Sequence, residues 1–116
     1  VDTDINGVSQ ELNDFKDEVA DYVIESGSNS NGNWEKWNSG KLVQWGFMVW
    51  QKDNKVLTFP LPFVNNNYTP FTQMDAVQEF DRSVSVQRTS SSTMTVYIFN
   101  GPQQMGVHYQ VIGRWK

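Results

Sequence analysis

The chain has 116 residues, no cysteine and a formal net charge of −4 at pH 7. The lack of cysteine excludes disulfides, iron–sulfur clusters, thiolate zinc sites and cysteine nucleophiles. No apolar run approaches the roughly 18 residues that a membrane-spanning helix needs, so we expect no membrane insertion.

The charge is divided unevenly along the chain. Residues 1–25 sum to −7 and residues 26–116 sum to +3, which together give the −4 of the whole chain. The basic residues of the second part are scattered, whereas a nucleic-acid surface needs them clustered on one face, so no nucleic-acid partner is expected. Because the first residue is Val1 and not Met, we expect the chain to be a piece of a longer protein.

Residues 1–27 are expected to form the end of a coiled-coil stalk. Apolar residues recur there at alternating spacings of three and four, the pattern of the a and d positions of a heptad. These positions, the expected oligomerisation site, are Ile5, Val8, Leu12, Phe15, Val19 and Tyr22. The aromatic residues at d do not suit a narrow two-stranded seam, so a homotrimer is the preferred assembly. The alternative is an amphipathic helix packed on its own β domain, although such a helix usually has a wider apolar stripe.

Residues 28–33 are small and polar and are predicted to be a flexible hinge. From residue 34 to residue 116, short apolar segments alternate with turn residues about every ten positions. This pattern predicts a mainly β domain, an antiparallel β-sandwich or small barrel, of which we adopt the β-sandwich. The predicted strands are Lys41–Trp50, Lys55–Phe59, Tyr68–Asp75, Ser83–Arg88, Thr93–Phe99 and Val107–Trp115.

The first of these strands is expected to bury one face in the core. The residues on that face are Val43, Trp45, Phe47 and Val49. Of these, the two aromatic residues are expected to fill the core. Gln44 would then lie on the opposite face, where it could bond across a strand or a subunit boundary. Gly46 is expected to permit a bulge or the close approach of another backbone.

Three sequence elements resemble the C-terminal tip domain of bacteriophage tail fibres. The segment Trp37–Gly46 resembles the opening of that domain, in which a Trp and a Ser-Gly turn precede an aliphatic pair and Gln-Trp-Gly. The later elements are a strand ending in Phe-Pro-x-x-Phe and a C-terminal aliphatic-Gly-x-Trp. Their matches here are Phe59, Pro60 and Phe63, and Ile112, Gly113 and Trp115. The resemblance implies a homotrimeric, receptor-binding domain at the distal end of a tail fibre in a virion.

Aromatic residues make up 14% of the chain, and aromatic rings can stack on the apolar faces of sugars. The turn at residues 100–106 is rich in amides, which suit adaptable polar contacts. The candidate ligand-binding residues are Trp50, Tyr68, Phe71, Tyr97, Asn100, Gln103 and Gln104.

Residues that could carry out catalysis are sparse. His108 is the only histidine, so one chain cannot form a cluster of histidine ligands. An outward-facing strand histidine is the preferred interpretation, and whether three copies meet around an ion at a three-fold axis stays open. The carboxylates form no credible pair for glycoside hydrolysis. We therefore expect no enzyme activity, no catalytic residues, no cofactor and no metal site.

Together these features predict a domain that attaches a phage or phage-like particle to a host bacterial surface. The expected receptor is a polysaccharide, and an outer-surface protein is the other candidate. One alternative is a trimerisation cap that protects the fibre end without touching a receptor. Another is a generic carbohydrate-binding β-sandwich, and a third is a polysaccharide-degrading enzyme, which the missing carboxylate pair disfavours.

Overall fold

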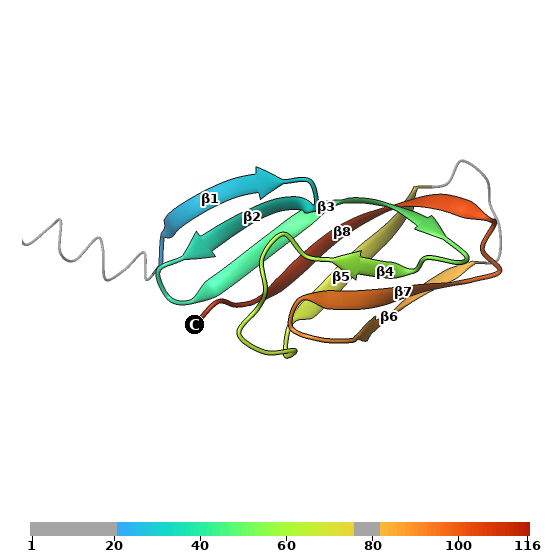
Figure 1. The fold of residues 1–116 in the computed structure, drawn as a ribbon. Coiled ribbons are helices and arrows are strands. Elements are labelled where there is room, and N and C mark those ends of the chain that lie inside the picture. The colour runs from blue at the N-terminus through green and yellow to red at the C-terminus, as the bar shows by residue number, and fades with distance from the viewer. Residues whose placement is uncertain (1–20, 76–81) are drawn as a thin grey trace, which may run out of the picture.

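The computed structural model describes residues 21–75 and 82–116. These residues form eight strands in two antiparallel sheets and contain no helix. The large sheet has the strand order β1-β2-β3-β8-β5 and the small sheet has the order β4-β7-β6 (Figure 1). The strands are β1 (Val23–Asn29), β2 (Gly32–Trp37), β3 (Lys41–Gln51), β4 (Val56–Thr58), β5 (Thr69–Asp75), β6 (Ser83–Arg88), β7 (Thr93–Phe99) and β8 (Gln104–Arg114). The prediction of a mainly β, antiparallel domain is confirmed.

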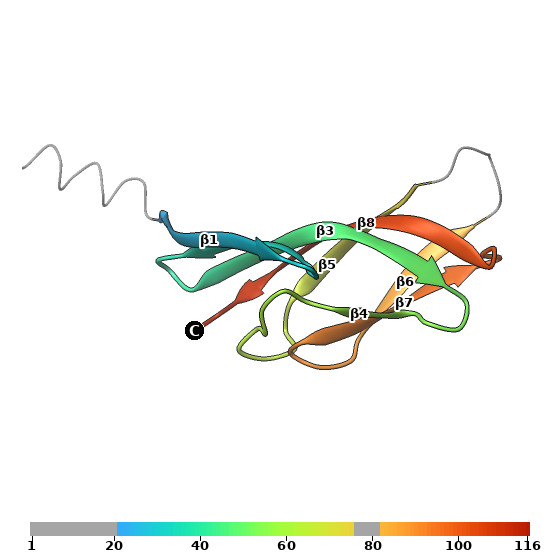
Figure 2. The same cartoon turned by 45° about the horizontal axis from the view of Figure 1, so that its top comes forward.

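The two sheets lie in separate layers. β3 and β8 pair along their full length, from Lys41 opposite Arg114 to Gln51 opposite Gln104, and form the centre of the large sheet. Figure 2 shows the small sheet below one half of the large sheet, while the β1–β2 hairpin projects beyond it. The large sheet therefore has one face toward the small sheet and one face away from it. We call the second the large-sheet outer face.

The N-terminal part of the described chain differs from the prediction. The stalk was expected to extend through residue 27, with a hinge at 28–33, but residues 23–37 form the β1–β2 hairpin and its turn. Tyr109 stabilises the turn, since its hydroxyl donates a hydrogen bond of 2.6 Å to the carbonyl oxygen of Asn31. The small polar residues therefore belong to a hairpin. Of the six heptad positions, Tyr22 directly precedes β1 and is exposed, and the other five lie outside the described residues.

Strand β3 turns a different face to the core than the sequence predicts. Its buried residues are Leu42, Gln44, Met48 and Trp50. The predicted core residues Trp45 and Phe47 lie on the large-sheet outer face, where Phe47 is 51% exposed. Both faces of β3 are mostly apolar, so alternation alone cannot select the inward face.

Gly46 lies directly opposite Tyr109 in the β3–β8 pair, and the register is continuous there, without a bulge. A Cβ atom at Gly46 would lie 2.9–3.2 Å from the hydroxyl and ring atoms of Tyr109. The close approach that the sequence predicts is therefore made by a side chain and not by another backbone. This placement lets the Tyr109 ring cross β3 on its way to the hairpin turn.

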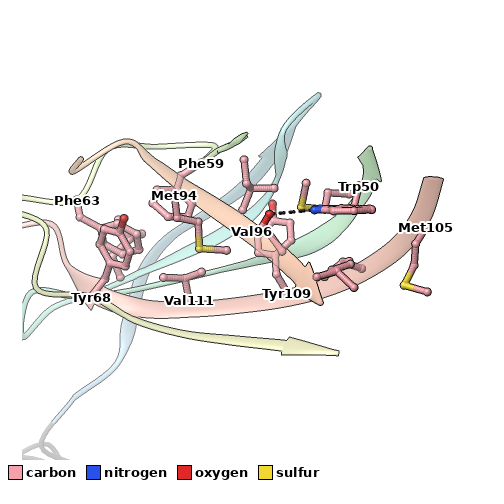
Figure 3. Packing of buried hydrophobic residues seen from close by; sticks show 14 residues of the cluster. Trp50, Phe59, Phe63, Tyr68, Met94, Val96, Met105, Tyr109 and Val111 are labelled. Atoms are coloured by element: carbon pink, nitrogen blue, oxygen red, sulfur yellow. Dashed lines mark hydrogen bonds between the residues drawn. The ribbon is translucent and has the colours of Figure 1, made fainter. Parts of the chain in front are cut away.

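The core lies between the two sheets (Figure 3). Trp50 joins the layers directly, because its Nε1 donates a 2.9 Å hydrogen bond to the carbonyl oxygen of Val96 in β7. At the other end of the core, Phe59, Phe63 and Tyr68 form an aromatic cluster whose ring centroids are 4.9–5.1 Å apart. Backbone hydrogen bonds from the Phe63 N–H to the carbonyl oxygen of Ser91 and from the Val64 N–H to that of Arg114 attach the connection between β4 and β5 to the β6–β7 turn and to β8.

Candidate functional site

The side chain of Gln44 connects two of the three motif elements. It is completely buried, its Nε2 donates to the carbonyl oxygen of Leu61 at 2.9 Å, and its Oε1 accepts from the Leu61 N–H at 2.8 Å. Leu61 lies between the two Phe residues of the Phe-Pro-x-x-Phe element. The Gln44 amide thus pairs with both backbone groups of Leu61, as a residue of a neighbouring strand would. The two hydrogen bonds link β3 to a loop of the same chain.

The C-terminal element packs against the other two. The Phe63 ring lies so close to Gly113 that a Cβ there would be 2.6–2.8 Å from ring atoms. The Trp115 N–H donates to the carbonyl oxygen of Gly40, and its indole Nε1 donates to that of Trp37, both at 2.8 Å. Gly40 has a φ of 106°, a left-handed conformation that favours glycine. The motif residues therefore build the fold, and a ligand surface must be sought elsewhere.

Two predicted ligand-binding residues are core residues. Trp50 and Tyr68 are each 1% exposed, so the prediction that they contact a ligand is wrong. The Tyr68 hydroxyl lies 2.9 and 2.8 Å from the carbonyl oxygens of Ser90 and Thr93, and desolvation raises the pKa of Tyr68 although the charge of Arg88 opposes it. Backbone carbonyls thus satisfy the polar groups of both aromatic side chains, which the sequence could not show.

The other predicted residues are accessible and lie on two different surfaces. Tyr97 points away from the core on the small sheet. Asn100 and Gln103 are exposed at the turn between β7 and β8, where Asn100 has a φ of 57°. Gln104 is the first residue of β8 and, opposite Gln51, lies on the large-sheet outer face, as does Phe71, which is 54% exposed. The structure therefore places Tyr97, Asn100 and Gln103 along β7 and the turn that follows it, and puts Gln104 and Phe71 on the other surface.

The side of the small sheet that faces away from the core combines hydroxyl and amide groups with two aromatic rings. We call it the small-sheet face, and its residues are Val56, Thr58, Ser83, Ser85, Gln87, Thr93, Thr95, Tyr97 and Phe99. Tyr97 is 40% exposed and Phe99 is 66% exposed. Phe99 is missing from the predicted site residues. Its alternation with the buried residues Met94, Val96 and Ile98 was the signal that could have placed it outward.

Side-chain contacts order the small-sheet face. The Tyr97 hydroxyl donates to Oε1 of Gln87 at 3.1 Å, and the Lys55 Nζ lies 5.6 Å from the centroid of the Tyr97 ring. The hydroxyl oxygens of Thr89 and Thr95 lie 2.8 Å apart beside them. Aromatic rings surrounded by such groups can bind a ligand that has both an apolar face and several hydroxyl groups.

The large-sheet outer face carries a shallow hollow of about 320 Å³, lined by Phe71, Thr72, Gln73, His108, Tyr109 and Gln110. His108 points outward, as predicted, with its Nε2 3.6 Å from Oδ2 of Asp75 and its ring centroid 5.0 Å from that of Phe47. Within residues 21–75 and 82–116, no three His, Asp or Glu side chains are grouped to hold a metal ion. The same residues include no helix long and apolar enough to cross a membrane.

Comparison with known proteins agrees with the three motif elements. The family model described as "Putative tail fiber protein gp53-like, C-terminal" matches residues 36–114. No curated protein matches the chain.

Two solved structures share the fold. A fragment of the P. aeruginosa R2 pyocin fibre has 20% identity and a TM-score of 0.62, and the match covers 78% of this chain and 26% of that chain. An N-truncated R2-type pyocin tail fibre has 17% identity and a TM-score of 0.61, with 85% and 41% covered. This chain thus spans less than half of either fibre fragment. Since the family model spans most of the chain, the protein belongs to the gp53-like family of tail fibre C-terminal domains.

Proposed function

We propose that this domain is the receptor-binding tip at the distal end of a tail fibre, where it attaches a phage or phage-like particle, as a homotrimer, to a host bacterium. The observation that carries the proposal is the small-sheet face, on which Tyr97 and Phe99 are exposed among hydroxyl and amide groups. A surface polysaccharide is the proposed receptor. The domain binds it without breaking bonds, so no enzyme activity is assigned.

The two rings are suitably placed to act together. Tyr97 and Phe99 are alternate residues of β7, so their side chains stand roughly 7 Å apart on one face. One oligosaccharide could contact both rings through its apolar faces. Ser83 and Ser85 lie directly opposite them on β6 and offer hydroxyl groups to the sugar hydroxyls. Asn100 and Gln103 add two exposed amide groups at the turn that follows β7.

Symmetry would strengthen a weak individual contact. A homotrimer presents three equal copies of the small-sheet face, and a particle carries several fibres. Linked sites of this kind can exceed the affinity of one site by about 10²–10⁴ without new contacts. Firm attachment therefore requires only modest affinity at each small-sheet face.

The test is binding of the labelled domain to a panel of bacterial strains and to polysaccharides purified from them. We expect Tyr97→Ser and Phe99→Ser each to weaken binding roughly thirtyfold, since a hot-spot aromatic contributes about 2 kcal/mol. Val64→Ser is the matched control, because Val64 is 53% exposed but lies outside the small-sheet face.

Unchanged binding by a folded Tyr97→Ser/Phe99→Ser double variant would refute the receptor role of this face. Binding by no strain or polysaccharide at all would favour the trimerisation cap. New reducing ends in the polysaccharide after incubation with the domain would contradict the non-enzymatic assignment.

A further inference from the structure

Strand β3 is apolar on the large-sheet outer face, whereas its neighbour β8 carries polar residues there, among them His108 and Gln110. The apolar residues of this face, which we call the apolar stripe, are Val43, Trp45, Phe47 and Val49 of β3, Phe71 of β5 and Ile112 of β8. Phe47, Val49 and Phe71 are 51%, 48% and 54% exposed. Since the opposite side of β3 is already buried in the core, the strand is apolar on both sides. That pattern is typical of a strand covered on both faces.

The area of this face is close to the area that one partner buries in a protein–protein interface. β3 and β8 are roughly 37 Å long, but β1, β2 and β5 have six or seven residues and are only roughly 20–24 Å long. With strands about 4.8 Å apart, the flat area of the face is therefore on the order of 700 Å². A standard protein–protein interface buries about 800 Å² on each partner, so contacts with neighbouring copies could cover most of the face.

Charged groups on this face lie toward its edges and carry both signs, and Asp75 of the edge strand β5 already pairs with His108. Lys41 and Arg114 are opposite each other at one end of the β3–β8 pair. Glu35 lies on β2 opposite Val43, the next residue of β3 after Lys41 that points to the same face. Glu35 forms no ion pair within the described residues. In a copy rotated about an axis parallel to β3, Arg114 on the β8 side would approach Glu35 on the β2 side of its neighbour. The rim is thus complementary to itself in a head-to-tail, cyclic arrangement.

The hollow beside Phe71 and His108 fits the same arrangement. It lies on the β5–β8 side of the face, whereas the exposed Phe47 and Val49 project from β3. A cyclic arrangement brings these two sides of neighbouring copies together, so an apolar side chain of one copy can enter the hollow of the next. The contact would then have the interlocking side chains of a specific interface.

We propose that the large-sheet outer face is the surface through which copies of this chain pack around their symmetry axis, with the apolar stripe of each copy against the next. The occupant of the face is therefore a second copy of the same chain. The inference concerns assembly and does not depend on the receptor role of the small-sheet face. It leaves the small-sheet face on the outside of the assembly, with Tyr97 and Phe99 accessible.

Distances between copies test the proposal. The chain has no cysteine, so one introduced cysteine carries one spin label for pulsed electron paramagnetic resonance. The labels are placed in the full chain at Val49→Cys on the apolar stripe and at Phe99→Cys on the small-sheet face. Gln51→Cys, at the rim of the large-sheet outer face, is a second label position on that face, where a label disturbs packing less. We expect shorter distances between copies at positions 49 and 51 than at position 99.

Light scattering on the same full-length variants completes the test. A mass of about three times 13.4 kDa together with the expected order of distances supports the proposal. A trimeric mass with the shortest distances at position 99 would overturn it, because the copies would then meet through the other face. A mass of 13.4 kDa would also overturn it, since the face would have no second copy to contact.

Discussion

Replacement of Gln44 by leucine tests whether the motif elements hold the fold together. Leucine fills nearly the same buried space but removes both hydrogen bonds to Leu61. The Leu61 N–H and carbonyl then lose their partners, and each unsatisfied buried group costs about 1–3 kcal/mol. Leu61 is only partly buried, so water can relieve some of this cost. We expect the free energy of unfolding to fall by about 3 kcal/mol.

Urea denaturation and thermal unfolding measure this loss. For a domain of this size, about 3 kcal/mol corresponds to a fall in Tm of roughly 10 °C or more. All variants must be compared at one protein concentration, because assembly makes Tm concentration-dependent. Gln103→Leu is the control, since it makes the same change at an exposed position of the β7–β8 turn and should stay within about 0.5 kcal/mol of wild type. A Gln44→Leu variant as stable as Gln103→Leu would show that the two hydrogen bonds to Leu61 do not stabilise the fold.

Three further variants test single contacts. Tyr109→Phe removes the bond to Asn31 and should cost about 1 kcal/mol in urea denaturation. Burial raises the pKa of Tyr109, so as the pH rises the unfolded chain loses the hydroxyl proton before the folded chain does. The stabilisation from this hydroxyl is therefore complete below about pH 10 and declines above it. Between neutral and alkaline pH, Tyr109→Phe should therefore lose less stability than wild type. Gly46→Ala should cost about 1–3 kcal/mol by forcing the Tyr109 ring to shift, and an unchanged Tm would contradict that contact. Trp50→Phe should cost about 2–4 kcal/mol, because it leaves the Val96 carbonyl unpaired and a cavity beside it, and a loss below 1 kcal/mol would contradict this.

Regular alternation made much of the fold predictable. In β7, Met94, Val96 and Ile98 alternate with polar or exposed residues, and the strand has the bounds that the sequence predicts. β3 has no such contrast, since it is apolar on both sides, and its inward face was predicted wrongly. The decisive residue is Gln44, whose burial depends on a loop backbone 17 residues away. Such a partner is set by the tertiary structure and is absent from the local pattern.

Only part of the candidate site was predictable, because several of its residues also depend on partners that are distant in the sequence. The polar β1–β2 turn has the composition of a hinge, and its order depends on Tyr109, 78 residues from Asn31. Trp50 and Tyr68 have the polar handles that exposed recognition residues share, but backbone carbonyls satisfy both inside the core. Phe99 could have been found from the alternation of β7, because it follows Tyr97 on the outward side. The composition thus indicated that aromatic residues bind the ligand, but which of them are exposed depends on the tertiary packing.

Hydroxyl-radical footprinting of the full chain, read by mass spectrometry, shows whether the two faces of the domain have different partners. In a single copy, Phe47 and Phe99 have comparable exposures of 51% and 66%. We expect Phe99 to be oxidised readily and Phe47 to be protected by the neighbouring copy. Addition of the bound polysaccharide should then protect Phe99 as well. Similar oxidation rates for Phe47 and Phe99 in the free protein, or no protection of Phe99 by the polysaccharide, would contradict the assignment of the two faces.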